Sequence, residues 1–384
     1  MAEARGVIGL ARIGAGTPAQ VLVVLHVALA IGNSLTLWSV PRRLLVVVGV
    51  LLLAYEAVGF RSMKHEQVFL YVVGAWIAAA LTLNGVFFGE WVQESVYLPG
   101  NVGVALALCR GHVSRRATAA LFYVVALYFV YRLVTVSSPG AIHQILVTGS
   151  ANGISAFAIL LCCLHYAVTR SEGARIPLLP AIVCFLVSAL TLGRSGMGAA
   201  ALIVVGMAIY DLVMERRNRL LALKLVVYGT VATVAIVLIV PRLDAISFVF
   251  ERFAEYGLGS EARDRIWDAY GSTLEGPAVL IGHEPEQVFA GYINVHSSYL
   301  LWHKSMGLMA LPLYVLAAAA LLRALVRDWV LFVLLGALLF RSSFDEIILP
   351  FRLFDFVFYY LVCTSLVTLA PRRVPAPLPR PVEA

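Results

Sequence analysis

The sequence predicts an all-α polytopic membrane protein with about 12 transmembrane helices and one large, partly helical loop. Hydrophobic residues make up 61% of the 384 residues, and charged residues only 13%. Soluble domains carry about 25% charged residues, so a soluble fold of this length could not cover its surface. The third observation is one long hydrophilic stretch, 241–295, in an otherwise apolar chain.

Apolar stretches long enough to span a bilayer recur along the chain. A transmembrane helix needs about 20 apolar residues, because it crosses about 30 Å at about 1.5 Å per residue. Two stretches, 97–109 and 327–341, are short. The pair at 176–213 is nearly continuous, and Arg194 in its middle favours a turn, since an arginine inside a bilayer is costly. The expected spans are 19–38, 44–60, 66–84, 97–109, 117–136, 150–168, 176–192, 195–213, 220–240, 297–322, 327–341 and 350–370.

These spans divide the chain into four parts. Residues 1–240 hold the first nine helices, 241–295 form the loop, and 296–370 hold the last three helices. Residues 371–384 are rich in proline and arginine and are expected to be a disordered tail. The first apolar stretch is long enough to remain as a helix, so no cleavable signal is expected.

Cysteines and charge constrain the partners. The cysteines all lie in or beside apolar segments and none lies in the long loop, so we expect neither a disulfide framework nor a zinc site, and interpret them as small packing residues. They are Cys109, Cys162, Cys163, Cys184 and Cys363. The net charge of +7 comes mostly from loops that would face anionic lipid, so no nucleic-acid partner is expected.

Lysine and arginine concentrate in alternate loops, which predicts the topology. The positive-inside rule places both termini in the cytoplasm and the 241–295 loop on the opposite side, the periplasmic face of a bacterial inner membrane. The short loops on the disfavoured side hold mainly four arginines: Arg42, Arg43, Arg194 and Arg341. Arg42 and Arg43 are interpreted as side chains that snorkel to the interface, although they stay candidates for a site.

The loop has the pattern of a folded cap. Ser260 suits the N-cap of a helix, and Glu261 suits the positive end of its dipole. Ile266, Trp267 and Tyr270 then recur at helical spacing, which predicts one apolar face. Trp267 is interpreted as an interfacial anchor.

Arginine and histidine gather around this loop. Arg194 lies in the expected turn, Arg263 and Arg265 lie on the loop helix, and His296 opens the next span. Guanidinium groups bind phosphate through a planar fork and keep their charge near neutral pH. An imidazole can accept a proton there. The four residues together predict a site for an anionic substrate.

Three short strings resemble the O-antigen ligase and O-antigen polymerase superfamily. Leu192-Gly193-Arg194-Ser195-Gly196 is similar to its S-R-[SG] turn, and Arg263-Asp264-Arg265-Ile266-Trp267 to its R-x-x-[IL]-W helix. His296-Ser297-Ser298-Tyr299-Leu300 resembles its H-N-x-[YL]-L helix entry. Ser297 departs from the family's asparagine. Gly282-His283-Glu284 replaces a Gly-x-Gly, which makes Glu284 a further candidate and leaves His283 open as an alternative proton acceptor.

The resemblance implies an O-antigen ligase. Such an enzyme transfers a glycan from undecaprenyl diphosphate to lipid A-core with inversion and without a metal or other cofactor. It implies that His296 is the general base and that Arg194, Arg263 and Arg265 bind the diphosphate. The residues agree, because the loop holds no Asp-x-Asp pair of the kind that often carries a metal in soluble glycosyltransferases.

Other functions stay open at this stage. A polymerase would use the same chemistry with a second lipid-linked repeat as acceptor. A polysaccharide-lipid flippase or transporter would instead be expected to show internal repeats and charges inside several spans. Glu56 is left unassigned, and the charged residues around Asp345 are interpreted as internally paired rather than as an acceptor site.

Overall fold

A computed structural model describes residues 18–35, 39–58, 64–90, 92–135, 145–146, 151–191, 193–214, 230, 261–348 and 354–367. Within these residues every regular element is a helix, and the only β pairing is one isolated bridge between Phe289 and Tyr292. The all-α class is therefore confirmed. The expected span at 220–240, the first part of the loop and the tail at 371–384 lie outside the described residues.

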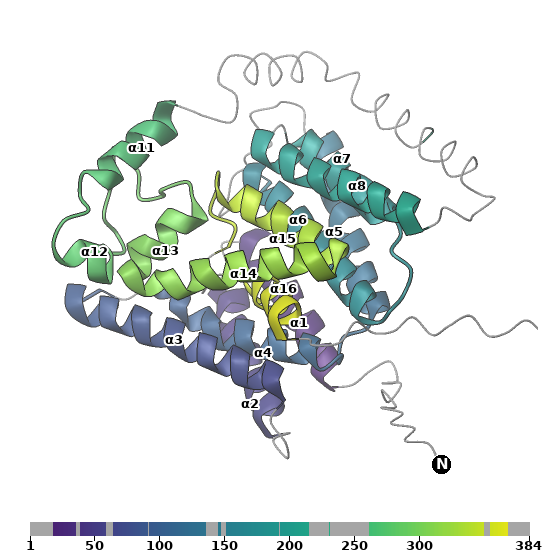
Figure 1. Ribbon diagram of the computed structural model, residues 1–384, viewed down its shortest axis with the longest axis horizontal. Coiled ribbons are helices and arrows are strands. Elements are labelled where there is room, and N and C mark those ends of the chain that lie inside the picture. The colour runs from purple at the N-terminus through teal and green to yellow at the C-terminus, as the bar shows by residue number, and fades with distance from the viewer. Residues whose placement is uncertain are drawn as a thin grey trace, which may run out of the picture.

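A helix lies in each expected span that the described residues cover (Figure 1). The helices are α1 (Pro18–Leu35), α2 (Ser39–Val58), α3 (His65–Phe88), η1 (Gln93–Tyr97), α4 (Leu98–Cys109), α5 (Arg115–Thr135), α6 (Ala151–Ser171), α7 (Leu179–Leu190), α8 (Arg194–Met214), α11 (Glu261–Gly271), α12 (Pro277–Ile281), α13 (Ser298–Met306), η4 (Gly307–Ala310), α14 (Leu311–Arg327), α15 (Trp329–Ser342) and α16 (Phe356–Val367).

Six helical segments of the described chain are long and apolar enough to cross a membrane: Pro18–Leu35, His65–Phe88, Arg115–Thr135, Asn152–Ser171, Arg194–Val213 and Ser298–Arg327. The apolar helices α4, α7, α15 and α16 are shorter than a full crossing. In α2, the charged residues Arg42, Arg43 and Glu56 interrupt an otherwise apolar helix. A membrane-embedded helical protein is therefore supported, and the count of twelve spans stays a prediction.

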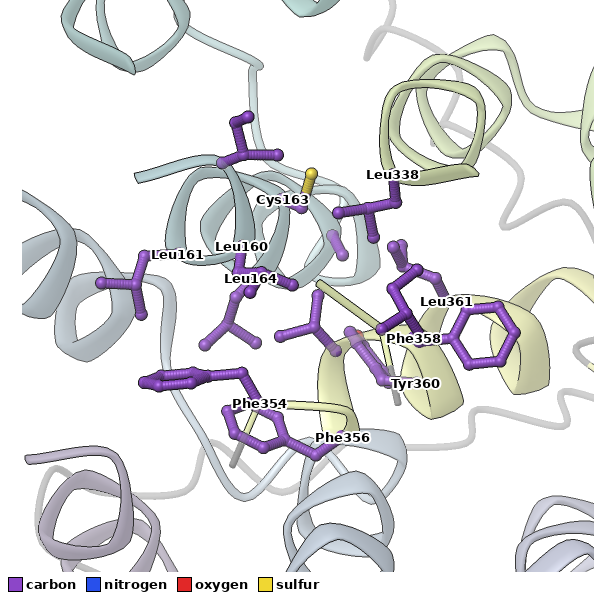
Figure 2. Packing of buried hydrophobic residues seen from close by; sticks show 14 of the residues in the cluster. Leu160, Leu161, Cys163, Leu164, Leu338, Phe354, Phe356, Phe358, Tyr360 and Leu361 are labelled. Atoms are coloured by element: carbon purple, nitrogen blue, oxygen red, sulfur yellow. The ribbon is translucent and has the colours of Figure 1, made fainter. Parts of the chain in front are cut away.

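The interior of the bundle forms around the short helices α4 and α16. Nearly every residue of both helices is buried, whereas the long helix α5 leaves Val124 and Leu127 two-thirds exposed, at 67% each. A helix that is apolar all round belongs in the interior, and an exposed apolar face suits lipid. Figure 2 shows side chains near the start of α16, such as Phe356 and Phe358, packed against Leu160 and Leu164 of α6 and Leu338 of α15.

Glycines allow α2 and α4 to lie almost in backbone contact. A Cβ on Gly49 would stand 2.7 Å from the Cα of Gly100, and one on Gly103 would stand 2.8 Å from the nitrogen of Leu53. Small residues at helix crossings allow this close approach inside membranes. Glu56, which has a fully buried side chain, adds a polar link because it accepts hydrogen bonds from Arg110 (2.6 Å) and His112 (2.8 Å).

Residues 261–297, here called the cap, contain α11 and α12 and cover one end of the bundle (Figure 1). The span expected at 297–322 is not one continuous helix. It breaks at Gly307, which has φ +55° and lies against the backbone of Leu280, so that a side chain there would collide with α12. His303, Lys304 and Ser305 interrupt the apolar pattern before this break, although one span was expected across it.

The α2–α4 contact predicts different outcomes for two glycines. Gly103→Ala should lower the free energy of unfolding by about 1–3 kcal/mol, because the new methyl group overpacks the interface with Leu53. Gly32→Ala in α1 is the matched control, since a Cβ there meets no atom within 4 Å. Thermal unfolding in detergent measures both; equal melting temperatures would contradict the close approach.

Candidate active site

A buried arginine joins three helices at the cap end of the bundle. Arg341, in the last turn of α15, is 0% exposed. Its Nη2 donates to Asp345 Oδ2 at 2.9 Å and to the carbonyl of Asn152 at 3.3 Å, and its Nη1 donates to the hydroxyl of Ser195. The guanidinium therefore ties α15 to the first turns of α6 and α8.

The turn that carries Arg194 presses against the start of α6. Helix α7 ends at Leu190 and α8 begins at Arg194, which confirms the predicted break in the long apolar stretch. A Cβ on Gly193 would stand 2.7 Å from Asn152 Oδ1, and one on Gly196 would stand 2.5 Å from Ser155 Oγ. The two glycines beside Arg194 thus let this turn approach α6 closely.

Helix α11 confirms the predicted helix of the cap and its apolar face. Ile266 and Tyr270 are buried against Phe289 and Val295, so the apolar face packs on protein. Trp267 donates its indole N–H to the carbonyl of Val295 at 2.9 Å. The proposed N-cap, Ser260, lies outside the described residues.

Arg263 projects from α11 toward the same end of the bundle as Arg341. Its guanidinium lies over the ring of Phe344, 5.6 Å from the centroid. Burial lowers the pKa of Arg263, the nearby carboxylate of Asp345 opposes that shift, and the positive charges of Arg194 and Arg341 add to it. Arg194, Arg341 and Asp345 are thus each close enough to Arg263 to act on its charge.

His296 is held in a strained position beside this group. Its φ of +51° is in the left-handed region, which side chains other than glycine rarely adopt. Its backbone N–H donates to Asn294 Oδ1 at 2.6 Å, and the N–H of Val295 donates to Glu346 Oε1 at 3.1 Å. These bonds fix the chain that leads into His296.

The next two serines secure the start of α13. Ser297 is its N-cap and accepts a hydrogen bond from the N–H of Leu300, so a hydroxyl serves where the family's asparagine would stand. Ser298 donates to the carbonyl of Asp345 at 3.0 Å and accepts from the N–H of Ile347 at 3.1 Å. The segment that carries His296 is thereby joined to residues 345–348.

The imidazole of His296 suits a proton acceptor. Burial lowers its pKa, Asp345 opposes this by favouring the protonated ring, and Arg263 adds to it. The net effect is a pKa below the ordinary value of 6.5, which favours the neutral ring near neutral pH. A neutral imidazole among fixed positive charges can take a proton from an incoming hydroxyl.

The structure places Arg263 within electrostatic range of Arg194 and His296, and adds Arg341 and Asp345 to its surroundings. From the sequence, Arg341 stood out only as an arginine on the side of the membrane that the positive-inside rule disfavours. The charges around Asp345 were interpreted as internally paired. Asp345 is paired with Arg341, yet it also acts electrostatically on both Arg263 and His296. The i, i+4 spacing of Arg341 and Asp345 was the available signal for the pair.

The other candidates lie in different surroundings. Arg265 is exposed, and its Nε lies 3.4 Å from the carbonyl of Glu261 in its own helix. Glu284 is exposed on the cap, and Arg43 is exposed in the first turns of α2. The guanidinium of Arg42 lies 5.9 Å from the ring centroid of Tyr97.

His283 belongs to a second polar cluster, inside the cap. Its ring meets those of Tyr270 and Phe289 edge to face, and its Nε2 lies 3.4 Å from Thr273 Oγ1. Its backbone N–H donates to the carbonyl of Lys304 at 2.7 Å. These contacts hold the cap together and give His283 neighbours other than the arginines.

Lys304, which sequence reasoning did not single out, is the anchor of this second cluster. It is 2% exposed, and its ammonium donates to the carbonyls of Gln287 and Ile293 at 3.0 Å each. The hydroxyl of Tyr270 lies 2.6 Å from Nδ1 of His303, which precedes Lys304. His303 and Lys304 thus bind α13 to the cap.

An apolar groove of about 470 Å³ runs between α14 and α15, and its lining includes Tyr299, Tyr314, Leu321 and Phe340. The ring of Phe340 lies 5.3 Å from that of Phe344, the ring beneath Arg263. Phe340 thus places one wall of the groove next to the ring that Arg263 covers. Among the described residues, no group of three His, Cys, Asp or Glu side chains could hold a metal ion.

Comparison with protein-family models, curated proteins and solved structures finds no match to this chain.

The electrostatics around His296 predict opposite pKa shifts for two substitutions. Asp345→Asn should lower the pKa of His296 further, because it removes a negative charge, and Arg263→Gln should raise it. Diethylpyrocarbonate reacts with the neutral imidazole, so the pH dependence of His296 modification, followed by mass spectrometry, reports the pKa. Shifts of the same sign in both variants would contradict the arrangement.

Proposed function

We propose that this protein is an O-antigen ligase, a metal-independent inverting glycosyltransferase. It transfers a glycan from undecaprenyl diphosphate to lipid A-core at the periplasmic face of the bacterial inner membrane. The observation that carries the proposal is the grouping of Arg194 and Arg263 with a neutral, partly buried His296 at one end of a membrane bundle. Each of the three motif strings that resemble this superfamily contains one of these three residues.

The reaction is a single displacement at the anomeric carbon. A hydroxyl oxygen of the acceptor sugar forms a new bond to that carbon while the bond to the diphosphate oxygen breaks. The diphosphate leaves with the electron pair, and the hydroxyl proton passes to the imidazole of His296. General-base catalysis of this kind contributes about 10²–10⁴-fold. Asp345 stabilises the imidazolium that forms, since its charge already favours the protonated ring.

The leaving diphosphate gathers negative charge as the bond breaks, and preorganised cations stabilise it. Arg194 and Arg263 supply this charge, and Arg341 adds a fixed positive charge from within the bundle. Arg265 assists from the exposed side of α11. The isoprenoid chain would lie in the groove beside Tyr299 and Phe340, because that groove is apolar and Phe340 contacts Phe344, the ring beneath Arg263.

The charge distribution supports the orientation of this site. Arg115 and Arg170 lie at the ends of α5 and α6 opposite to Arg194, where Arg170 pairs with Asp328 at 2.8 Å. The positive-inside rule assigns that end and both termini to the cytoplasm. The cap end then faces the periplasm, where lipid-linked glycans meet their acceptors.

Removal of the base or of the clamp should abolish activity. His296→Ala and Arg263→Ala are each expected to reduce glycan transfer by at least about 10²-fold, because each removes a group that acts on the transition state. The measurement is the rate of glycan transfer by purified protein in vesicles, with membrane insertion checked by fractionation.

Arg265→Ala is the matched control on the same helix. Its side chain is exposed and bonds only weakly to its own helix, so its loss should cost far less than that of Arg263. Normal transfer by both His296→Ala and Arg263→Ala would show that the site is assigned wrongly.

The acceptor separates a ligase from a polymerase, which would use the same chemistry. Purified protein is given an undecaprenyl-diphosphate glycan with either lipid A-core or a second lipid-linked repeat. We expect the lipid A-core to be extended. Extension of the lipid-linked repeat alone would establish a polymerase, and extension of neither acceptor would contradict glycosyl transfer.

A further inference from the structure

Apolar side chains gather on the outside of the cap, where water would be expected. Leu280 of α12 is 58% exposed, and Val288, Tyr292, Ile293 and Leu308 are each about half exposed, between 48% and 54%. These five residues are called the apolar rim. By contrast, α11 exposes charged residues such as Asp264 and Asp268. The exposed residues of the cap are thus charged on α11 and apolar at the rim positions, with Glu284 and Glu286 exposed between Leu280 and Val288.

The depth of α12 follows from two hydrogen bonds to α3. The side-chain amide of Asn84 donates to the carbonyls of Ile281 (3.0 Å) and His283 (3.1 Å). Asn84 lies four residues before the end of α3 at Phe88, which places the end of α12 about 6 Å inward from the end of the helix. The last turn of α3 is apolar and exposes Val86 and Phe87. Helix α12 therefore lies beside this span rather than above it.

The remaining members of the rim adjoin α12. The backbone of Leu280 packs on Gly307, and Leu308 follows directly at the start of the next apolar segment. Lys304 receives the N–H of His283 on its carbonyl and binds the carbonyls of Gln287 and Ile293 with its ammonium. Lys304 of α13 thus holds the end of α12 beside the start and the end of the turn that follows it.

That turn is tight and well defined. Ala290 and Gly291 have φ of +48° and +86°, and the bridge between Phe289 and Tyr292 closes the turn around them. Successive positive φ values are typical of a type I′ hairpin turn. With Phe289 buried inside the cap, the neighbouring apolar side chains Val288 and Ile293 remain outside.

We propose that the apolar rim is immersed in the bilayer, in the leaflet on the cap side, and anchors the cap to phospholipid. The depth of α12 and its continuity with the exposed apolar end of α3 identify lipid as the occupant. Amphipathic segments bury their apolar side at the boundary of headgroups and acyl chains in this way. His296 follows Ile293 by three residues, so the anchor sets the height of the imidazole above the lipid. The inference does not depend on glycosyl transfer.

Spin labels test the position of the rim in the complete protein. Leu280→Cys and Ile293→Cys carry a nitroxide in a Cys109→Ser background, because the other cysteines are buried. The protein is reconstituted in vesicles of phosphatidylethanolamine and phosphatidylglycerol. Collisions with oxygen, which partitions into lipid, are compared with collisions with a water-soluble nickel chelate. Val86→Cys on α3 is the lipid-facing control, and Asp268→Cys on α11 is the aqueous control.

Immersion predicts that the ratio of oxygen to nickel collisions at residues 280 and 293 approaches that at Val86 and exceeds that at Asp268 severalfold. A ratio equal to that at Asp268 would show that the rim stands in water. Protection from both reagents would show that protein covers the rim, such as a second copy of this chain. Either of these results would overturn the proposal.

Discussion

The buried ion pair between Arg341 and Asp345 is the interaction on which the cap end depends. A charged guanidinium at 0% exposure would be very costly without partners, because desolvation inside a protein costs several kcal/mol per ion. Here the carboxylate of Asp345, the hydroxyl of Ser195 and the carbonyl of Asn152 surround it. The same requirement for partners brings α6, α8 and α15 together, and thereby places Arg194 in the turn before Ser195.

Asp345 extends this order from the bundle into the cap. The negative charge of its carboxylate acts on Arg263 and on His296, and its backbone carbonyl accepts a hydrogen bond from Ser298. The strained backbone of His296 persists because hydrogen bonds fix the chain around it, and such strain is commonly found at functional sites. The proposed site therefore lies at the junction of the cap and the membrane bundle, with the proposed base on a short connecting segment and the arginines on helices.

Much of the helical framework was predictable, because long apolar stretches leave few alternatives in a membrane protein. Arg194, Arg263 and His296 could be singled out because each stands in a short motif beside a charged loop. The partners of Arg341 could not, since Asn152 and Ser195 meet it only after three helices have packed. The same limit applies to Lys304, whose carbonyl partners come from a turn of the cap, and to the break before α14, which only contact with α12 explains.

The coupling between Arg341 and Asp345 tests this account most directly. A double-mutant cycle of Arg341→Met and Asp345→Asn compares the free energies of unfolding of the two single variants and the double variant. If the pair organises the cap end, each single variant is strongly destabilised, the double variant is no worse than the worse single one, and the coupling energy exceeds about 1 kcal/mol. Effects that add to within about 0.5 kcal/mol would contradict the central role of this ion pair.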